Sequence, residues 1–309
     1  MMALLALVFL TRTEAFVSPH SSSRRTQQSA TATSLPAEEE VLDLEQLYSS
    51  PNEKEALLVA IAGTARGQSV KTDKAKILSL VEALESEETY TLEDMEGRWS
   101  LAYSDGQLFR SSPFWMAGRA TCRTQEEAKR YDLFCDLHRA ATAVGSIGAV
   151  RQIIDSKTRK FVSEFETTVA ASPQRVGGAL PVTISGAIVS SADIVDHDGR
   201  ITTLYVDDVA IKGSNIPLLR PMLDSMLKLD SRAVANALSP LLTAPRPSIK
   251  TTYVDDNIRI VRENIDDDPT LFVYVRDSPG THLTAYDDTP ADLGLSGLLT
   301  RAASTFPFF

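Results

Sequence analysis

The sequence predicts a mainly β protein with helices, in which an antiparallel barrel or sandwich follows an N-terminal helical segment. Beyond Thr91, several stretches alternate apolar and polar residues, which is the pattern of half-buried strands. Between Glu38 and Glu88 the apolar residues recur at steps of three and four, which is typical of helices. Because a closed barrel leaves no strand edge unpaired, many short antiparallel strands with one apolar face favour a closed or double-layered sheet.

The first 37 residues are typical of a two-part targeting sequence. An apolar run over residues 3–10 precedes a small residue at a plausible cleavage point, Ala15, which predicts a signal peptide over residues 1–15. Residues 16–37 are rich in Ser and Thr and contain arginines but no acidic residue, which is the composition of a transit peptide. The junction of Ala15 and Phe16 resembles the bipartite plastid presequences of algae whose plastids lie inside extra membranes. A single secretory signal followed by a disordered spacer is the alternative.

Residues 38–90 form the predicted helical segment. Gly63 and Gly67 end its first stretch, and Thr72 is the predicted N-cap of the next helix. The apolar residues at helical spacing are Leu42, Leu44, Leu47, Leu57, Leu58 and Ile61, then Ile77, Leu78, Leu80, Val81 and Leu84.

Residues 91–280 are predicted to form the β domain. Its alternating strands are expected at residues 98–104, 160–169, 181–195, 200–213 and, as a final hairpin, 250–264 with 270–277.

Two segments with helical spacing interrupt these strands. The first covers residues 126–155, with Leu133, Leu137 and Val144 on one face, and the second covers residues 216–242, where three prolines break it. They could close or line the mouth of a barrel. Residues 281–309 follow as an apolar C-terminal tail.

Composition excludes several classes of protein. A net charge of -10 and 43% hydrophobic residues describe an acidic chain with an ordinary core, not a phosphate-tracking nucleic-acid binder. Removal of residues 1–37 would leave 28 basic and 40 acidic residues, a net charge of -12. After the first dozen residues no apolar run approaches the roughly 20 residues that span a bilayer, so any membrane association is expected to be peripheral.

Several strings, in order, resemble the plastid-lipid-associated protein family, also called fibrillins. They are LLVAIAGTARG, LEDMEGRWSLAYS, FRSSPFWMAGRA, SEFE, LPVTISGAIVSSADI, IKGSNIPLLRPMLDS, KTTYVDDNIRIVREN and LFVYVRD, within residues 53–277. The resemblance implies a lipocalin-like antiparallel barrel that binds lipids or other hydrophobic molecules in the plastid, at thylakoids or lipid globules. It implies no catalytic residues, and the ligand differs among members.

The first strand carries the element Gly97-x-Trp99, which is similar to the lipocalin first-strand motif. The resemblance implies that Trp99 closes the barrel floor against an arginine of the last strands. Arg259, Arg262 or Arg276 could supply that cation.

The second tryptophan, Trp115, lies with Phe109 and Phe114 in a serine- and proline-containing segment that we predict to be a loop at the barrel mouth. These rings could contact an apolar ligand or a lipid surface, or they could pack under a helix. The further candidates for ligand contact are Tyr103, Phe165, Tyr205 and Tyr253.

Other chemical patterns are weak. The paired aspartates adjoin predicted strand ends, where Asp is a turn residue. Cys135 and His138 have helical spacing but no second pair of ligands, so no metal or cofactor is predicted, and Cys122 and Cys135 are expected to be free thiols. No nucleophile elbow or phosphate loop occurs, so we predict a protein that is not an enzyme.

The leading functional hypothesis is a carrier or sequestering protein for a lipid, quinone or pigment, located in the plastid stroma or peripherally at thylakoids or plastoglobules. The first alternative is a structural coat protein, in which the tail and the SSPFW segment touch lipid and side chains fill the barrel. The second alternative is an enzyme of lipid or isoprenoid metabolism.

Overall fold

The structure is a computed structural model, and it describes residues 52–122, 124–141, 145–171, 182–217, 220, 229–230, 246–265, 269–296 and 299–300. The chain divides into two compact units, Met1–Asn52 and Glu53–Phe309, and the second contains every described helix and strand. The predicted signal and transit peptides lie outside the described residues, as do the predicted helical stretch around Leu44, most of the predicted proline-broken insertion and the end of the tail.

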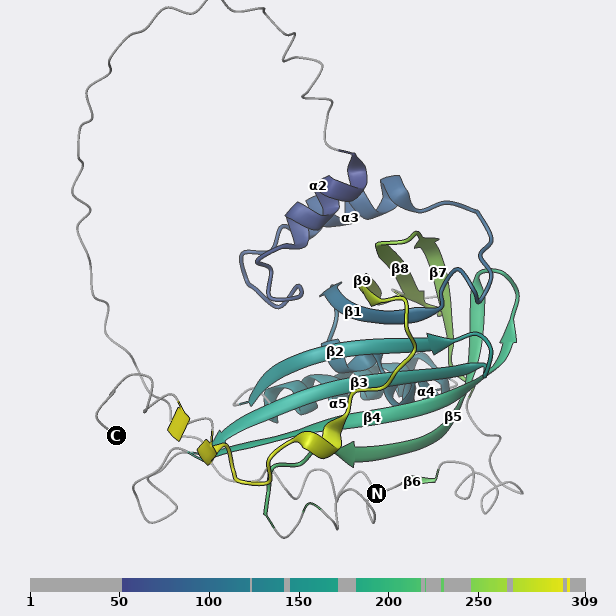
Figure 1. Cartoon of the computed structure of the whole chain (residues 1–309). Coiled ribbons are helices and arrows are strands. Elements are labelled where there is room, and N and C mark those ends of the chain that lie inside the picture. Colours follow the sequence, from purple (N-terminus) through teal and green to yellow (C-terminus); the bar gives the residue numbers. More distant parts are fainter. Residues whose placement is uncertain are drawn as a thin grey trace, which may run out of the picture. The chain divides into compact units, whose positions relative to one another are not determined.

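Eight antiparallel strands close into a barrel (Figure 1). They are β1 (Gly97–Ser104), β2 (Gly145–Asp155), β3 (Lys160–Ala171), β4 (Val182–His197), β5 (Ile201–Lys212), β7 (Ser248–Val254), β8 (Ile258–Glu263) and β9 (Leu271–Ser278). Their order is β4-β3-β2-β1-β9-β8-β7-β5, and a further pairing of β4 with β5 closes the ring. A short strand, β6 (Leu229–Asp230), pairs with β5. The predicted antiparallel barrel is confirmed.

Buried side chains line the inside of the described barrel. Alternate residues of the strands point inward and form one cluster whose members are at most 8% exposed, so these side chains are shielded from solvent as in a protein core. The 3₁₀ turn η2 (Leu108–Ser111) and the helix α4 (Pro113–Ala120) contribute to it from within the ring. Its largest members include Trp99, Phe109, Met116, Phe161, Phe165, Phe272 and Tyr274.

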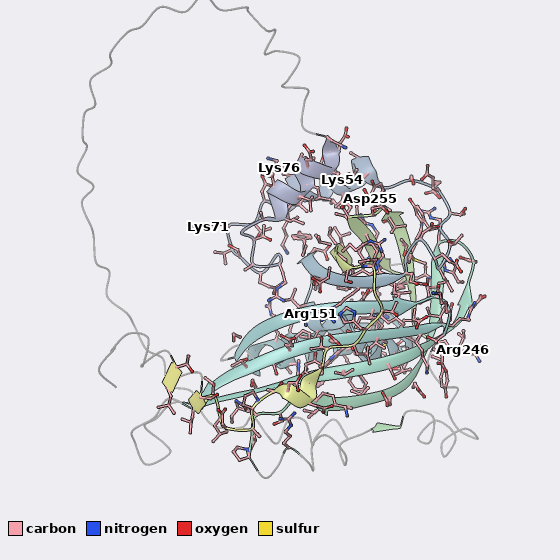
Figure 2. The ribbon with its side chains drawn as sticks, viewed as in Figure 1. Lys54, Lys71, Lys76, Arg151, Arg246 and Asp255 are labelled. Atoms are coloured by element: carbon pink, nitrogen blue, oxygen red, sulfur yellow. The ribbon has the colours of Figure 1, made fainter. Side chains whose placement is uncertain are left out.

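Two helices cover part of the outer wall. The helices α2 (Glu53–Ile61) and α3 (Lys74–Leu84) bury Leu57 and Val81 against outward residues of β1, β8 and β9. A register shift in β1 between Leu101 and Tyr103 turns Tyr103 outward into this second cluster. Lys54 of α2 and Asp255, beside β7, point toward each other and pair at 2.8 Å (Figure 2).

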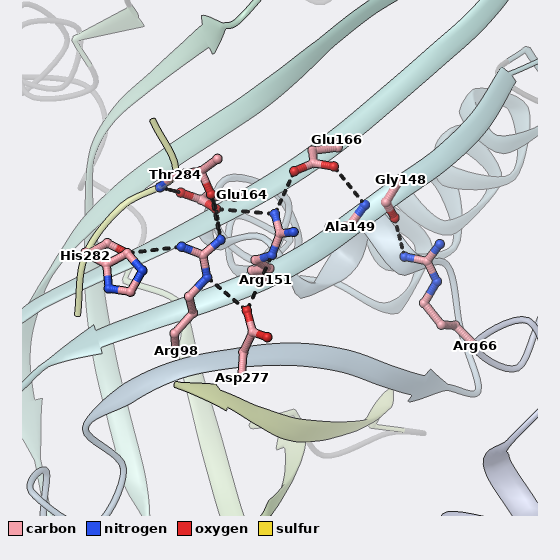
Figure 3. A network of polar contacts seen from close by, with 10 residues as sticks. All are labelled: Arg66, Arg98, Gly148, Ala149, Arg151, Glu164, Glu166, Asp277, His282 and Thr284. Carbon is pink, nitrogen blue, oxygen red and sulfur yellow. Dashed lines mark hydrogen bonds and ion pairs between the residues drawn. The ribbon is translucent and has the colours of Figure 1, made fainter. Parts of the chain in front are cut away.

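The loop between α2 and α3 is anchored to the barrel by backbone contacts. Gly67 has a φ of +85°, and a Cβ there would lie 2.0 Å from the Ser104 carbonyl oxygen, so only glycine fits. Next to it, Arg66 donates to the carbonyl oxygens of Gly148 and Ile147 on β2, at 2.5 and 2.7 Å (Figure 3).

The first helical insertion is shorter than predicted. The helix α5 (Gln125–Ala141) is present, but residues 145–155 form strand β2 and not a helix. The reason is that this segment pairs with β1 and β3 as an antiparallel strand. Every second residue, namely Val150, Gln152 and Ile154, then faces the barrel interior, and the residues between them face outward.

Three local predictions were also wrong. The SSPFW segment is not a loop, because Pro113 is the first residue of α4, where a missing N–H costs nothing. The predicted strand over residues 250–264 is two strands, since Asp255 accepts hydrogen bonds from the N–H groups of Asn257 and Ile258 and turns the chain. The N-cap of α3 is Asp73 and not Thr72, because the Asp73 carboxylate accepts from the Lys76 N–H at 3.1 Å.

The segment after β9 runs across the outer wall of β1, β2 and β3 (Figure 3). There Arg98 pairs with Asp277 at 3.1 Å, and Arg151 pairs with Glu166 at 2.6 Å. Further along, Leu293 donates its N–H to the Asn215 carbonyl oxygen at 3.0 Å. The described part of residues 281–296 therefore lies against the barrel.

Candidate functional site

Trp99 lies between two arginines at one end of the barrel interior. The Arg276 guanidinium carbon is 4.1 Å from the centroid of the indole, and that of Arg259 is 5.5 Å away. The indole N–H donates to the Met95 carbonyl oxygen at 2.9 Å, and Trp99 is fully buried. Two cations over one indole stabilise its position through cation–π attraction.

The structure brings only two of the three candidate arginines to Trp99. Arg262 instead pairs with Glu85 at 2.6 Å on the outer side, and this pairing raises the pKa of Arg262. Gly97, two residues before Trp99, has a φ of +125° and packs closely against the backbone at Ser278.

A layer of polar contacts crosses the interior above Trp99. Arg259 donates to the side-chain oxygen of Gln152, and the Gln152 amide donates to the Ser111 carbonyl oxygen at 2.8 Å. The hydroxyl groups of Ser112 and Ser190 lie 2.8 Å apart. These contacts tie η2 and the start of α4 to β2, β4 and β8.

An aromatic cluster joins α4 to α5. The Trp115 ring lies 4.5 Å from Phe109, 5.8 Å from Phe114, 5.8 Å from Phe134 and 4.8 Å from His138, measured between centroids. Trp115 also accepts a hydrogen bond at its carbonyl oxygen from the Tyr131 hydroxyl, at 2.6 Å.

Burial in this cluster is partial. Phe109 is buried in the barrel core, whereas Phe114, Trp115 and Phe134 keep exposed surface. Of the two arrangements that the sequence left open, the structure shows Trp115 packed against a helix while still reaching solvent.

Two large apolar side chains of α5 are exposed. Leu133 and Leu137 are 60% and 61% exposed, and Leu137 lies one turn from Phe134. The sequence predicted that these leucines share one face of a helix, and the structure shows that Ala128 and Cys135, and not the leucines, are the buried residues of α5. We call the surface formed by Phe114, Trp115, Leu133, Phe134 and Leu137 the α4–α5 face.

Two titratable groups beneath this face, His138 and Cys135, are uncharged at neutral pH. Burial lowers the pKa of His138 and raises the pKa of the Cys135 thiol to about 11. Deeper in, the Arg110 guanidinium pairs with Glu263 at 2.7 Å, so its charge is matched. The face is therefore suited to apolar contact.

The remaining candidate residues lie apart from this cluster. Phe165 points into the barrel core, whereas Tyr103 packs beneath α2 and α3 on the outer wall. Tyr253 also lies on that outer side and donates to Asp255 at 3.0 Å. Tyr205 follows the inward Leu204 on β5, so alternation directs it outward.

Within the described residues, no three His, Cys, Asp or Glu side chains are grouped so as to hold a metal ion. Both cysteines are free in the structure. No described helix has the length and apolar character needed to cross a membrane.

Sequence reasoning missed Gln152, Phe134 and the exposure of the two leucines. Gln152 could have been found from the alternation of Val150, Gln152 and Ile154, had residues 145–155 been assigned to a strand. Nothing in the sequence marks which face of α5 is buried, because that depends on where α4 lies.

A closed antiparallel barrel with a buried tryptophan between arginines and a helix-covered aromatic end defines a lipocalin-like β-barrel protein. The family model named PAP_fibrillin matches residues 52–274, so the chain belongs to the plastid-lipid-associated protein family. Membership implies a plastid location and association with plastid lipid structures, and the family is generally structural or lipid-associated. The searches of curated proteins and of solved structures gave no match.

Proposed function

We propose that this protein binds lipid or another hydrophobic molecule through the α4–α5 face and so carries or sequesters it at thylakoids or lipid globules. The observation that carries the proposal is the exposure of Leu133 and Leu137 beside the partly exposed rings of Trp115 and Phe134. Large apolar side chains grouped on a surface cost free energy in water, about 25 cal/mol per Å² of apolar area, and that cost is recovered on contact with lipid.

The charge of the protein favours apolar over electrostatic attachment. The full chain has a net charge of -10, which repels anionic lipid head groups. Trp115 is also the kind of side chain that lies well at a lipid–water boundary, because its ring is apolar and its N–H is polar. We therefore expect binding to neutral lipid surfaces without any gain from anionic lipid.

Flotation with phosphatidylcholine vesicles tests the proposal. The variant Leu133→Ser with Leu137→Ser should lose vesicle binding, because it removes the exposed apolar area but leaves the buried side of α5 intact. The matched control is Val59→Ser with Leu78→Ser, which changes two exposed apolar residues on α2 and α3. Equal flotation of both double variants and the unchanged protein would refute the role of the α4–α5 face.

The fluorescence of the two tryptophans shows which part of the protein contacts lipid. With Trp99→Phe the remaining indole is Trp115, and brominated lipids should quench its fluorescence. With Trp115→Phe the remaining indole is the fully buried Trp99, which should be unaffected. Quenching of Trp99 alone would show that lipid enters the barrel and not the α4–α5 face.

A structural coat protein is the second candidate, and the burial of the inward side chains favours it. A carrier should retain about one extractable ligand per chain after purification from plastids, whereas a coat protein should float with vesicles and carry none. Native mass spectrometry followed by solvent extraction separates the two.

A further inference from the structure

The inward polar groups of β3, β8 and β9 are not all matched. Arg259 and Tyr274 are fully buried, and Ser163 on β3 is 1% exposed. Arg259 uses one nitrogen, Nη2, to donate to Gln152. Its Nε and Nη1 and the Ser163 hydroxyl make no hydrogen bond within the described part of the chain. The Tyr274 hydroxyl lies close to Ser111 and Gln152. A buried polar group without a partner destabilises the fold, because its hydrogen bonds to water are lost and not replaced.

The charge of Arg259 is likewise unmatched by a carboxylate within the described residues. The charged or titrating groups that act on it are the Tyr274 phenol and Arg276, and Arg276 is a second cation. The inward carboxylate of Glu263, on the same strand, is held by Arg110 at 2.7 Å and by Thr270 at 2.8 Å. Burial lowers the pKa of Arg259 to about 10, so the guanidinium is still a cation at neutral pH.

The nearby aromatic rings offset only part of the free-energy cost of burying the Arg259 guanidinium. The Arg259 guanidinium carbon lies 5.5 Å from the Trp99 centroid and 5.0 Å from the Tyr274 centroid. A desolvated cation–π contact stabilises the guanidinium, but the rings do not supply oxygen acceptors for its remaining N–H groups. An oxygen acceptor that carries negative charge would satisfy both the charge and the donors.

The start of α4 adds to the positive character of this region. Ser111, just before α4, accepts from the same Gln152 that accepts from Arg259. Ser112 gives no side-chain hydrogen bond to its own helix, because its hydroxyl pairs with Ser190. The positive end of the α4 dipole is thus left without a side-chain cap beside the Arg259 layer.

We propose that Arg259, Tyr274 and Ser163 form a binding site for a carboxylate inside the barrel. The carboxylate oxygens accept from the guanidinium and from the two hydroxyl groups. The same chemistry is offered by the head group of a fatty acid and by a small free carboxylate. The carboxylate site itself does not depend on the proposed function. Only the assignment of the carboxylate to a fatty acid rests on that function, which supplies the hydrophobic molecule.

The test measures binding of ¹³C-carboxyl acetate, of palmitate and of its methyl ester to the full chain. The charged hydrogen bonds should favour palmitate over the ester about tenfold or more. Arg259→Gln should abolish this preference and leave ester binding unchanged. Tyr274→Phe, which deletes one hydroxyl and keeps the ring, should weaken carboxylate binding several-fold. Arg276→Gln is the matched control, because Arg276 contacts the same Trp99 ring at 4.1 Å but lies partly exposed, and it should keep the preference.

The outcomes separate the site from the proposed function. Binding of palmitate and acetate, both sensitive to Arg259→Gln, supports a site for either source of carboxylate. Binding of acetate alone supports the site and contradicts the carriage of a fatty acid. Equal affinity for palmitate and its ester, or an unchanged preference in Arg259→Gln and Tyr274→Phe, overturns the site while leaving lipid binding intact. Failure to bind any of the three probes overturns the site as well.

Discussion

Thr284 donates both its backbone N–H and its hydroxyl group to the carboxylate of Glu164, over 2.8 and 2.5 Å (Figure 3). Glu164 is fully buried although it lies on the outer wall of β3, opposite in direction to the inward Phe165. Arg98 and Arg151 lie 3.6 and 3.8 Å from the same carboxylate. Because a buried carboxylate must be hydrogen-bonded and paired, this contact fixes the segment after β9 on the barrel.

Replacing Thr284 should loosen that segment. Thr284→Val keeps the shape and the backbone donor but removes the hydroxyl, so Glu164 loses one of its hydrogen bonds. We expect the free energy of unfolding to fall by about 1–3 kcal/mol. Urea denaturation measures it, and Thr281→Val in the same segment is the control. An unchanged midpoint in Thr284→Val would mean that the backbone N–H of residue 284 and the two arginines satisfy Glu164 without the hydroxyl.

Stability should depend on pH through His138. Burial against Phe109 and Trp115 lowers the pKa of His138 below its usual 6.5. Below pH 6.5 the unfolded chain therefore takes up a proton that the folded chain does not. The unfolded state binds more protons in that window, so this residue makes the free energy of unfolding fall as the pH drops from about 7.5 to about 5.5.

The variant His138→Gln isolates this contribution. It should show a smaller loss of stability between the two pH values than the unchanged protein, measured by urea denaturation at each pH. His282→Gln changes an exposed histidine and should behave as the unchanged protein does. The idea fails if both variants lose the same amount of stability on acidification.

The barrel could be predicted from the sequence because the alternation of apolar and polar residues that marks each strand is a local pattern. The alternation around Trp99 and Leu101, and the similar patterns of β3, β4 and β5, come from one buried and one outer face on each strand. The strand at residues 145–155 was missed because its apolar residues continue the spacing of the preceding helix, and the change of period falls between them.

The candidate site was predictable only in part, because it depends on contacts between distant segments. Phe109, Phe114 and Trp115 were expected together, and they do form one cluster. The exposure of Leu133 was not foreseen, since α5 turns Tyr131 and Cys135 toward the barrel instead. The lack of an acceptor for Arg259 is a property of the assembled interior and has no signature in the sequence.

The two cysteines should react at very different rates. Cys135 is fully buried, and burial raises the pKa of its thiol to about 11, so little thiolate forms at pH 8. Burial also raises the pKa of the Cys122 thiol, but Cys122 is only half-buried beyond the end of α4, so a reagent reaches its sulfur more easily. With a disulfide reagent we expect one rapid equivalent from Cys122, and a second that appears only in denaturant. Cys122→Ser should abolish the rapid phase and Cys135→Ser should keep it. Rapid labelling of Cys122→Ser would instead show that the contact between α4 and α5 opens readily.

Gly97 should tolerate a side chain less well than Gly63, although both have positive φ. At Gly63, with a φ of +75°, an added Cβ would meet no other atom within 4 Å, so Gly63→Ala should cost only the backbone conformation, roughly 1–2 kcal/mol. At Gly97, with a φ of +125°, a Cβ would lie 2.8 Å from the Ser278 carbonyl oxygen and 3.0 Å from Arg276 Nη1. The backbone of β9 cannot yield without breaking its pairing with β1, so Gly97→Ala should cost about 1–3 kcal/mol more.

Trp99 fluorescence supplies a second measurement of the same substitution. A Cβ at Gly97 displaces Arg276, which lies 4.1 Å from the Trp99 centroid, so the emission of a Trp115→Phe background should shift in Gly97→Ala and stay constant in Gly63→Ala. Equal stability losses in the two variants, with no change in emission, would show that the Arg276 side chain moves freely. In that case the close approach of β1 and β9 at Gly97 would not be what holds Arg276 over the indole.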